Sequence, residues 1–253
     1  MNILCITHAD FETPGIIEEW AEQRGFYFSI CKPYKGEDCL THDPFDVLIV
    51  MGGPQSPLEI EKDPYLKDEI KLIAHAIHDN KIVLGFCLGA QLIGEALGGK
   101  TERSPEKEVG VYPIFLTELG REDPLFEGLP NPIPVIHWHN DMPGETKNSI
   151  VLATSQGCPR QILRYTPHVY GFQCHLEITL EGMRDMIKAC PGDLKPSRFT
   201  QTPEELLQQD YHEINQTMIK ILDRVVGLKE GHGKDNPCSS ICSISKIFTR
   251  LGN

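Results

Sequence analysis

The sequence lacks the long apolar runs of a membrane protein and the basic surplus of a nucleic-acid-binding protein. No window approaches the ~18 uninterrupted apolar residues that a membrane-spanning helix needs. Lys and Arg number 24 against 36 Asp and Glu, and the resulting net charge of -12 repels phosphate backbones and anionic lipid headgroups. We therefore expect no nucleic-acid partner and no membrane partner.

Closely spaced cysteines, internal repeats and a basic N-terminal leader are also missing. The nine cysteines are an odd set scattered through apolar runs, unlike the framework of a disulfide-rich secreted domain. This scatter and the absence of a signal-peptide pattern favour a reducing compartment, so we expect a cytoplasmic location. No repeat with a period of about 20 to 50 residues is present, which excludes solenoids and propellers. Cys238 and Cys242 form one pair in a polar stretch, which alone indicates neither a metal site nor a redox pair.

What is present is the composition of a folded globular domain, with 40% hydrophobic residues. Apolar runs alternate with stretches of helical periodicity, an order typical of a mostly parallel α/β sheet with helices on both faces. Short strands between proline and glycine turns dominate residues 109–173, and we expect some of them to pair antiparallel at one sheet edge. The alternation of apolar runs and helical periodicity ends after Gly227. Residues 1–227 are therefore predicted to form one domain, and residues 228–253 are predicted to form a flexible tail. The predicted strands are 2–8, 27–32, 46–51, 81–86, 109–115, 135–138, 150–153, 161–165 and 169–173, and the predicted helices include 65–79, 179–189 and 203–226.

A glycine-rich turn follows the predicted strand 81–86 and is the most informative segment of the chain. Gly85 and Gly89 flank Cys87 at two residues on either side, the spacing of a nucleophile elbow, in which a sharp strand-to-helix turn requires small residues. This turn would hold the sulfur above the sheet, and the following helix N-terminus favours the thiolate. The same spacing also fits a buried cysteine in an ordinary turn between a strand and a helix.

A cysteine nucleophile needs a histidine for proton exchange and a third group to orient that histidine. The segment GFQCHLE at 171–177 supplies both, because His175 and Glu177 share one face of an extended backbone with Cα atoms roughly 7 Å apart. A carboxylate can reach the imidazole across this distance. Alone, the pair would equally fit a histidine at a strand end beside a solvated glutamate.

Two further histidines, His137 and His139, raise the question of a metal. Neither has a cysteine, aspartate or glutamate at a recognised ligand spacing in the sequence. We therefore predict no metal site and no cofactor.

Three motifs in register resemble the class I (triad) glutamine amidotransferases: GFCLGAQ at 85–91, HLE at 175–177 and GGP at 52–54. The resemblance covers about residues 1–226 and is strongest to the amidotransferase domain of GMP synthetases and its stand-alone relatives. It implies a flavodoxin-like fold and hydrolysis of the glutamine side-chain amide through a cysteine γ-glutamyl thioester. The ammonia released would serve an acceptor at a separate site, so the implied partners are glutamine or another γ-glutamyl small molecule and a separate synthetase subunit. Because the chain has no SGGxDS-like phosphate loop, the resemblance implies a stand-alone amidotransferase.

Carried onto this sequence, the resemblance assigns a role to each motif residue. Cys87 would be the nucleophile, His175 the base and Glu177 the carboxylate that orients it. The backbone amides of Gly53 and Leu88 would form the oxyanion hole, where loss of one donor typically costs about 3 kcal/mol of transition-state stabilisation. The resemblance places substrate contacts at Gln91, His139 and Asp141.

Two residues depart from the family pattern. Leu176 stands where many relatives have proline, and Cys174 where an aromatic residue is usual. Neither is a reacting group, so only the rigidity of the loop is in question.

Two alternative functions stay open. One is a γ-glutamyl peptidase with the same triad, if the pocket admits a larger leaving group, and the other is a non-catalytic regulatory subunit.

Overall fold

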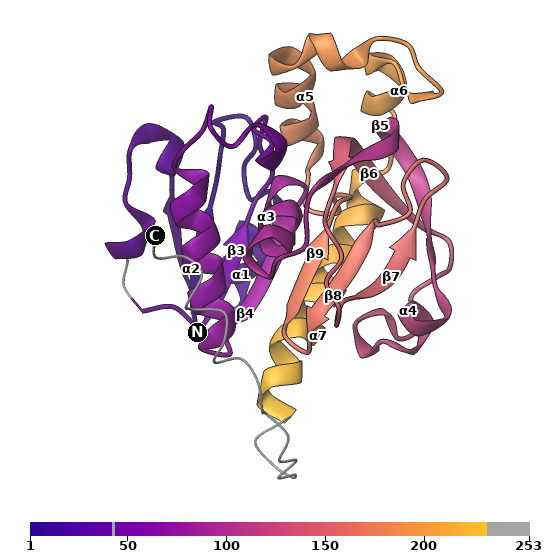
Figure 1. Ribbon diagram of the computed structural model, residues 1–253. Helices are drawn as coiled ribbons and strands as arrows, with labels where there is room; N and C mark the ends of the chain where they lie inside the picture. The colour runs from indigo at the N-terminus through magenta and orange to yellow at the C-terminus, as the bar shows by residue number, and fades with distance from the viewer. Residues whose placement is uncertain (42–43, 232–253) are drawn as a thin grey trace.

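A ten-stranded mixed sheet runs through the molecule in the order β10-β5-β7-β8-β9-β4-β3-β1-β2, with β6 paired to β5 (Figure 1). The computed structural model describes residues 1–41 and 44–231. All neighbours from β2 to β9 pair in parallel. These parallel strands are β1 (Asn2–Ile6), β2 (Tyr27–Cys31), β3 (Val47–Val50), β4 (Ile82–Phe86) and β9 (Val169–Phe172).

The other half of the sheet is antiparallel, as predicted for residues 109–173. Strand β8 pairs antiparallel with both β9 and β7, and β5 pairs antiparallel with β7 and β6, while the short β10 is parallel to β5. The switch from parallel to antiparallel falls at β9, the strand beside β4. These strands are β5 (Glu102–Leu116), β6 (Ile133–Met142), β7 (Ile150–Thr154), β8 (Ile162–Thr166) and β10 (Phe199–Thr200).

Helices cover both faces of the sheet, which confirms the predicted α/β architecture. In Figure 1, α2 (Leu66–His78) and α3 (Leu88–Ala96) lie in front of the strands and α7 (Tyr211–Gly231), in yellow, lies behind them. Helix α1 (Ile16–Gln23) packs with α7. The remaining helices are α4 (Glu118–Glu122), α5 (Leu180–Ala189) and α6 (Pro203–Leu207), with 3-10 turns η1 (Pro33–Lys35), η2 (Cys39–Thr41), η3 (Pro57–Glu59), η4 (Pro124–Phe126) and η5 (Pro191–Leu194).

Strand β3 shows why its sequence does not alternate in polarity. All four of its residues are buried. Val47 and Ile49 belong to the apolar cluster under α1 and α7, whereas Leu48 and Val50 belong to the cluster under α2 and α3. A strand covered on both sides needs apolar side chains at every position.

The predicted helix 203–226 is in fact two helices, which corrects the sequence interpretation. Helix α6 begins at a capping box between Thr202 and Glu205 and ends at Leu207. Asp210 then accepts a hydrogen bond of 3.0 Å from the backbone N–H of Glu213, and this local cap starts α7. The apolar stripe continues across the break, so periodicity alone did not reveal it. Helix α7 extends to Gly231, beyond the domain boundary predicted at 227.

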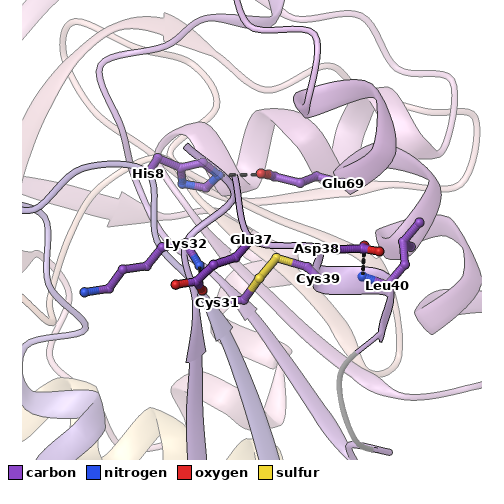
Figure 2. The surroundings of a disulfide bond; sticks show 8 residues. All are labelled: His8, Cys31, Lys32, Glu37, Asp38, Cys39, Leu40 and Glu69. Atoms are coloured by element: carbon purple, nitrogen blue, oxygen red, sulfur yellow. Dashed lines mark hydrogen bonds and ion pairs between the residues drawn. A yellow bond between two sulfur atoms is a disulfide. The ribbon is translucent and has the colours of Figure 1, made fainter. Parts of the chain in front are cut away.

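A disulfide joins Cys31 at the end of β2 to Cys39 in η2, with Cα atoms 5.8 Å apart (Figure 2). The scattered cysteine spacing did not predict this pairing. The predicted tail lies, from residue 232 onward, outside the described residues, together with Cys238 and Cys242. Within the described part of the chain, none of the helices is both long and apolar enough to cross a membrane.

Candidate active site

Cys87 occupies the sharp turn between β4 and α3, as the elbow spacing predicts. Its backbone adopts φ 49° and ψ -105°, a conformation that typically costs about 1–3 kcal/mol for a residue with a side chain. The flanking glycines make the turn sterically possible. A Cβ on Gly85 would lie 2.4 Å from the carbonyl of Gly89, and one on Gly89 would lie 1.9 Å from the carbonyl oxygen of Val50.

Neighbouring strands hold the elbow in place. The backbone N–H of Cys87 donates to the carbonyl oxygen of Phe172 in β9 at 2.7 Å. Its thiol points to the carbonyl oxygen of Trp138 in β6, 3.8 Å from Sγ. Cys87 is only 9% exposed, and it lines the cavity described below.

His175 follows β9 and faces the same region as Cys87. Its backbone forms two hydrogen bonds with Ile136 of β6, at 2.8 and 2.9 Å. Its Nδ1 lies 2.6 Å from Oε1 of Glu177, and both side chains are buried. Burial alone would lower the pKa of His175, but the charge of Glu177 and the interactions with Cys87 outweigh it and raise that pKa well above its usual value. The histidine is thus held in one orientation and readily accepts a proton.

The loop that carries His175 is braced from within and from α7. Oε2 of Glu177 accepts a 3.0 Å hydrogen bond from the backbone N–H of Leu176, which a proline at that position could not donate. Asn215 of α7 donates to the carbonyl oxygens of Leu176 and Ile178 at 2.8 and 3.0 Å. Two side chains therefore supply the rigidity that the missing proline put in question.

One cavity of about 240 Å³ brings the predicted residues together. Seven of the eight site residues that the sequence predicts line this cavity, and the eighth, Glu177, lies behind His175. The backbone N–H groups of Gly53 and Leu88 have no hydrogen-bond partner among residues 1–41 and 44–231. The lining includes Gly53, Cys87, Leu88, Gln91, His139, Asp141 and His175.

A buried histidine that the sequence interpretation missed holds the Gly52-Gly53 loop. Nδ1 of His8 lies 3.0 Å from the carbonyl oxygen of Gly52, and Nε2 lies 2.8 Å from the carboxylate of Glu69 (Figure 2). Both neighbours are acceptors, so both ring nitrogens donate and the imidazole is cationic. Burial opposes this charge, but Glu69 outweighs burial and raises the pKa of His8.

The predicted substrate contacts already have partners within the protein. The amide nitrogen of Gln91 donates to Oε1 of Gln173 at 3.0 Å, so its own oxygen is directed elsewhere. Asp141 accepts hydrogen bonds from Arg103 and Ser56, both at 2.6 Å. Its carboxylate is therefore neutralised by a cation, which the sequence interpretation did not foresee. A substrate ammonium at Asp141 stays a prediction.

In the structure, the two histidines of β6 have a carboxylate neighbour, Glu108 of β5. Among the described residues, these three side chains form a group whose ligand atoms are close enough together to hold a metal ion. However, the amide nitrogen of Gln161 lies 2.7 Å from Glu108 Oε2 and 3.2 Å from a ring nitrogen of each histidine. Burial lowers the pKa of His137 to about 3, so its Nδ1 is a neutral acceptor for Gln161 while Nε2 donates to the carbonyl oxygen of Tyr112. His139 donates to Glu108. The amide nitrogen of Gln161 thus occupies the space between the three ligand atoms, so Gln161 would have to move before a metal ion could bind, and Nδ1 of His139 has no hydrogen-bond partner among the described residues.

The fold and the site together define an α/β protein in which a strained cysteine and a carboxylate-bound histidine share one cavity at the ends of parallel strands. The glutamine amidotransferase class-I family matches residues 16–190. The chain therefore belongs to the class-I glutamine amidotransferases.

Individual relatives agree with this assignment. The glutamine amidotransferase-like protein YfeJ of Salmonella typhimurium is 43% identical over 232 residues, which are 89% of this chain and 97% of that protein. A subunit of the glutamine-hydrolyzing GMP synthase of Pyrococcus abyssi is 35% identical over 131 residues, 49% of this chain and 68% of that protein. A crystal structure of a glutamine amidotransferase from Thermotoga maritima superposes with a TM-score of 0.81 at 25% identity and covers 89% of this chain and 98% of its own.

Proposed function

We propose that the chain is a stand-alone hydrolase that releases ammonia from the side-chain amide of glutamine through a γ-glutamyl thioester on Cys87. One observation carries the proposal. The strained Cys87 shares a cavity with His175, and Glu177 binds the other side of that imidazole at 2.6 Å. A nucleophile, a base and an orienting carboxylate are the three parts that acyl transfer requires.

The first half of the reaction forms the thioester. His175 takes the thiol proton, and Sγ of Cys87 attacks the amide carbon of the substrate. The amides of Gly53 and Leu88, which have no internal partner in the described residues, donate to the resulting oxyanion. The tetrahedral adduct then breaks its C–N bond, His175 returns the proton to the nitrogen, and ammonia leaves.

The second half regenerates the enzyme. His175 takes a proton from water, whose oxygen attacks the thioester carbon, and the same two amides bind the second oxyanion. The C–S bond breaks, the thiol regains its proton and glutamate leaves. Glu177 stabilises the imidazolium in both halves, which is consistent with the raised pKa of His175.

The family and the cavity also support proposals about partners and organisation. We propose that residues 1–227 form the hydrolase domain and that the ammonia is passed to a separate synthetase subunit. The resemblance to one subunit of a GMP synthase supports this ammonia-donor role. A chain that acted only as a regulatory subunit would not need the strained backbone at Cys87 or the buried carboxylate behind His175.

The test is labelling and turnover at Cys87. We expect 6-diazo-5-oxo-L-norleucine, an electrophilic glutamine analogue, to label Cys87 selectively among the nine cysteines, as read by peptide mass spectrometry. Cys87→Ala should abolish labelling and lower kcat/KM for glutamine by about 10⁴-fold, because the thioester cannot form.

The matched control is Cys158→Ala, since Cys158 is buried and does not line the cavity. It should keep both labelling and turnover. Equal labelling of several cysteines, or full turnover by Cys87→Ala, would contradict the proposal. Turnover of γ-glutamyl dipeptides without turnover of glutamine would favour the peptidase alternative.

A further inference from the structure

Glu12, in the loop between β1 and α1, is a cavity residue with no role in the reaction described above. It lines the cavity together with Cys87 and His175. Its carboxylate and the imidazole meet above Gly52: a Cβ on Gly52 would lie 2.2 Å from Oε2 of Glu12 and 3.4 Å from Cε1 of His175. Because Gly52 has no side chain, the carboxylate can occupy this place beside the histidine.

The charge of Glu12 is not compensated by a Lys or Arg side chain. Within the described ranges it forms no hydrogen bond or ion pair, and the cationic groups that act on it are the imidazoles of His175 and His8. Burial raises the pKa of Glu12 to about 7, so at pH 8 it is an anion facing the cavity. Three other carboxylates of the cavity are each paired with a cation: Asp141 with Arg103 at 2.6 Å, Asp193 with Lys107 at 3.0 Å and Glu59 with Lys62 at 2.7 Å.

Glu12 lies close to the imidazole that protonates the leaving group in the proposed reaction. Nδ1 of His175 is held by Glu177, so Nε2 is the nitrogen that exchanges protons with Cys87 and with the departing amine. Cε1 is bonded to Nε2, and Glu12 lies beside Cε1. A substituent on the leaving nitrogen, which His175 protonates in the proposed reaction, would therefore lie in the cavity that Glu12 also lines.

We propose that Glu12 determines specificity for the leaving group: it favours γ-glutamyl compounds whose leaving amine is ammonia or carries a positive charge, and it disfavours γ-glutamyl amino acids. In a γ-glutamyl amino acid the leaving nitrogen bears a carboxylate two bonds away, which brings two like charges together in a partly desolvated cavity. A leaving amine with a cationic tail would form an ion pair at the same place. This inference rests on the proposed function, because it assumes acylation of Cys87 with His175 as the proton donor.

Three substrates with the same acyl group test the inference in the full-length protein at pH 8. They are γ-glutamylglycine with an anionic leaving group, γ-glutamylethylamide with a neutral one and the γ-glutamyl amide of 1,2-diaminoethane with a cationic one. We expect kcat/KM to be highest for the cationic substrate and lowest for the anionic one. In Glu12→Gln, the value for γ-glutamylglycine should rise about tenfold and that for the cationic substrate should fall about tenfold, as expected for one partly screened charge. The value for the neutral amide should change less than about twofold.

Glu18→Gln is the matched control, because Glu18 is exposed on α1 and removal of its charge should leave all three values unchanged. Unchanged ratios in Glu12→Gln, or a wild-type preference for γ-glutamylglycine, would overturn the inference about Glu12. If Cys87 is still labelled in that case, the proposed function stands. If none of the substrates is turned over and Cys87 is not labelled, both proposals fail.

Discussion

At the scale of single residues, the site depends on a backbone turn that only very small neighbours allow. Cys87 adopts a positive φ, and its flanking glycines touch backbone atoms where a Cβ would otherwise sit. In the proposed reaction, this strained turn lets the Leu88 amide at the start of α3 bind the oxyanion. The conformation that costs the fold stability is thus the one that the proposed chemistry uses.

Gly89→Ala tests this dependence on space. The new Cβ would lie 1.9 Å from the carbonyl oxygen of Val50, so the elbow must move away from β3. We expect a loss of about 3 kcal/mol or more in the free energy of unfolding, measured by urea denaturation, together with loss of glutamine turnover. Gly192→Ala is the control, because nothing lies within 4 Å of a Cβ there. A Gly89→Ala protein with wild-type stability would show that the close approach to β3 is not needed.

At the scale of secondary-structure elements, the site is assembled from the carboxyl ends of β1, β3, β4 and β9. Parallel strands bring these ends to one edge of the sheet, where loops from distant parts of the sequence meet. The loop after β3 contains Gly52 and Gly53. Its carbonyl at Gly52 is held by His8, which follows β1 and is itself held by Glu69 of α2.

His8→Ala tests whether this anchor positions the Gly53 amide. Without the imidazole, the Gly52 carbonyl loses its donor and the loop can rotate the amide away from the oxyanion. We expect kcat for glutamine to fall by about 10- to 100-fold with a smaller change in KM, because the amide acts mainly in the transition state. The control is His75→Ala, an exposed position on the same helix as Glu69. An unchanged kcat in His8→Ala would rule out this positioning role.

The sequence predicted most of the elements and the residues that the structure brings together at the candidate site, because both have local signals. Cys87 is marked by its two glycines, and His175 by a glutamate two positions later. His8, Glu12 and Asn215 have no such signal, since each acts on a residue that is dozens of positions away. The start of α7 was missed for the opposite reason: the local cap at Asp210 was present, but the apolar stripe across it suggested one continuous helix.

At the scale of the whole molecule, the disulfide ties the edge strand β2 to η2, away from the cavity of the candidate site. Neither Cys31 nor Cys39 lines that cavity, so the bond is expected to act on stability alone. The two cysteines are 8 positions apart, and closing so short a loop is worth about 2–3 kcal/mol in the chain-entropy account.

The double variant Cys31→Ser/Cys39→Ser measures this contribution. We expect its free energy of unfolding to fall by about 2–3 kcal/mol, while glutamine turnover at 25 °C stays within about twofold of wild type. Dithiothreitol should destabilise the wild-type protein by the same amount and leave the double variant unchanged. A wild-type protein that is indifferent to dithiothreitol would show that the bond does not form in solution.

The position of β9 in the sheet has a consequence for the order in which the protein matures. This strand lies next to β4 although more than 80 residues separate the two along the chain, and His175 comes only after it. A nascent chain that has left the ribosome only as far as the elbow thus contains Cys87 but neither His175 nor the strand β9 that pairs with the second side of β4. In the proposed reaction, a chain that terminates before β9 therefore lacks the base, and we expect its Cys87 not to form the thioester.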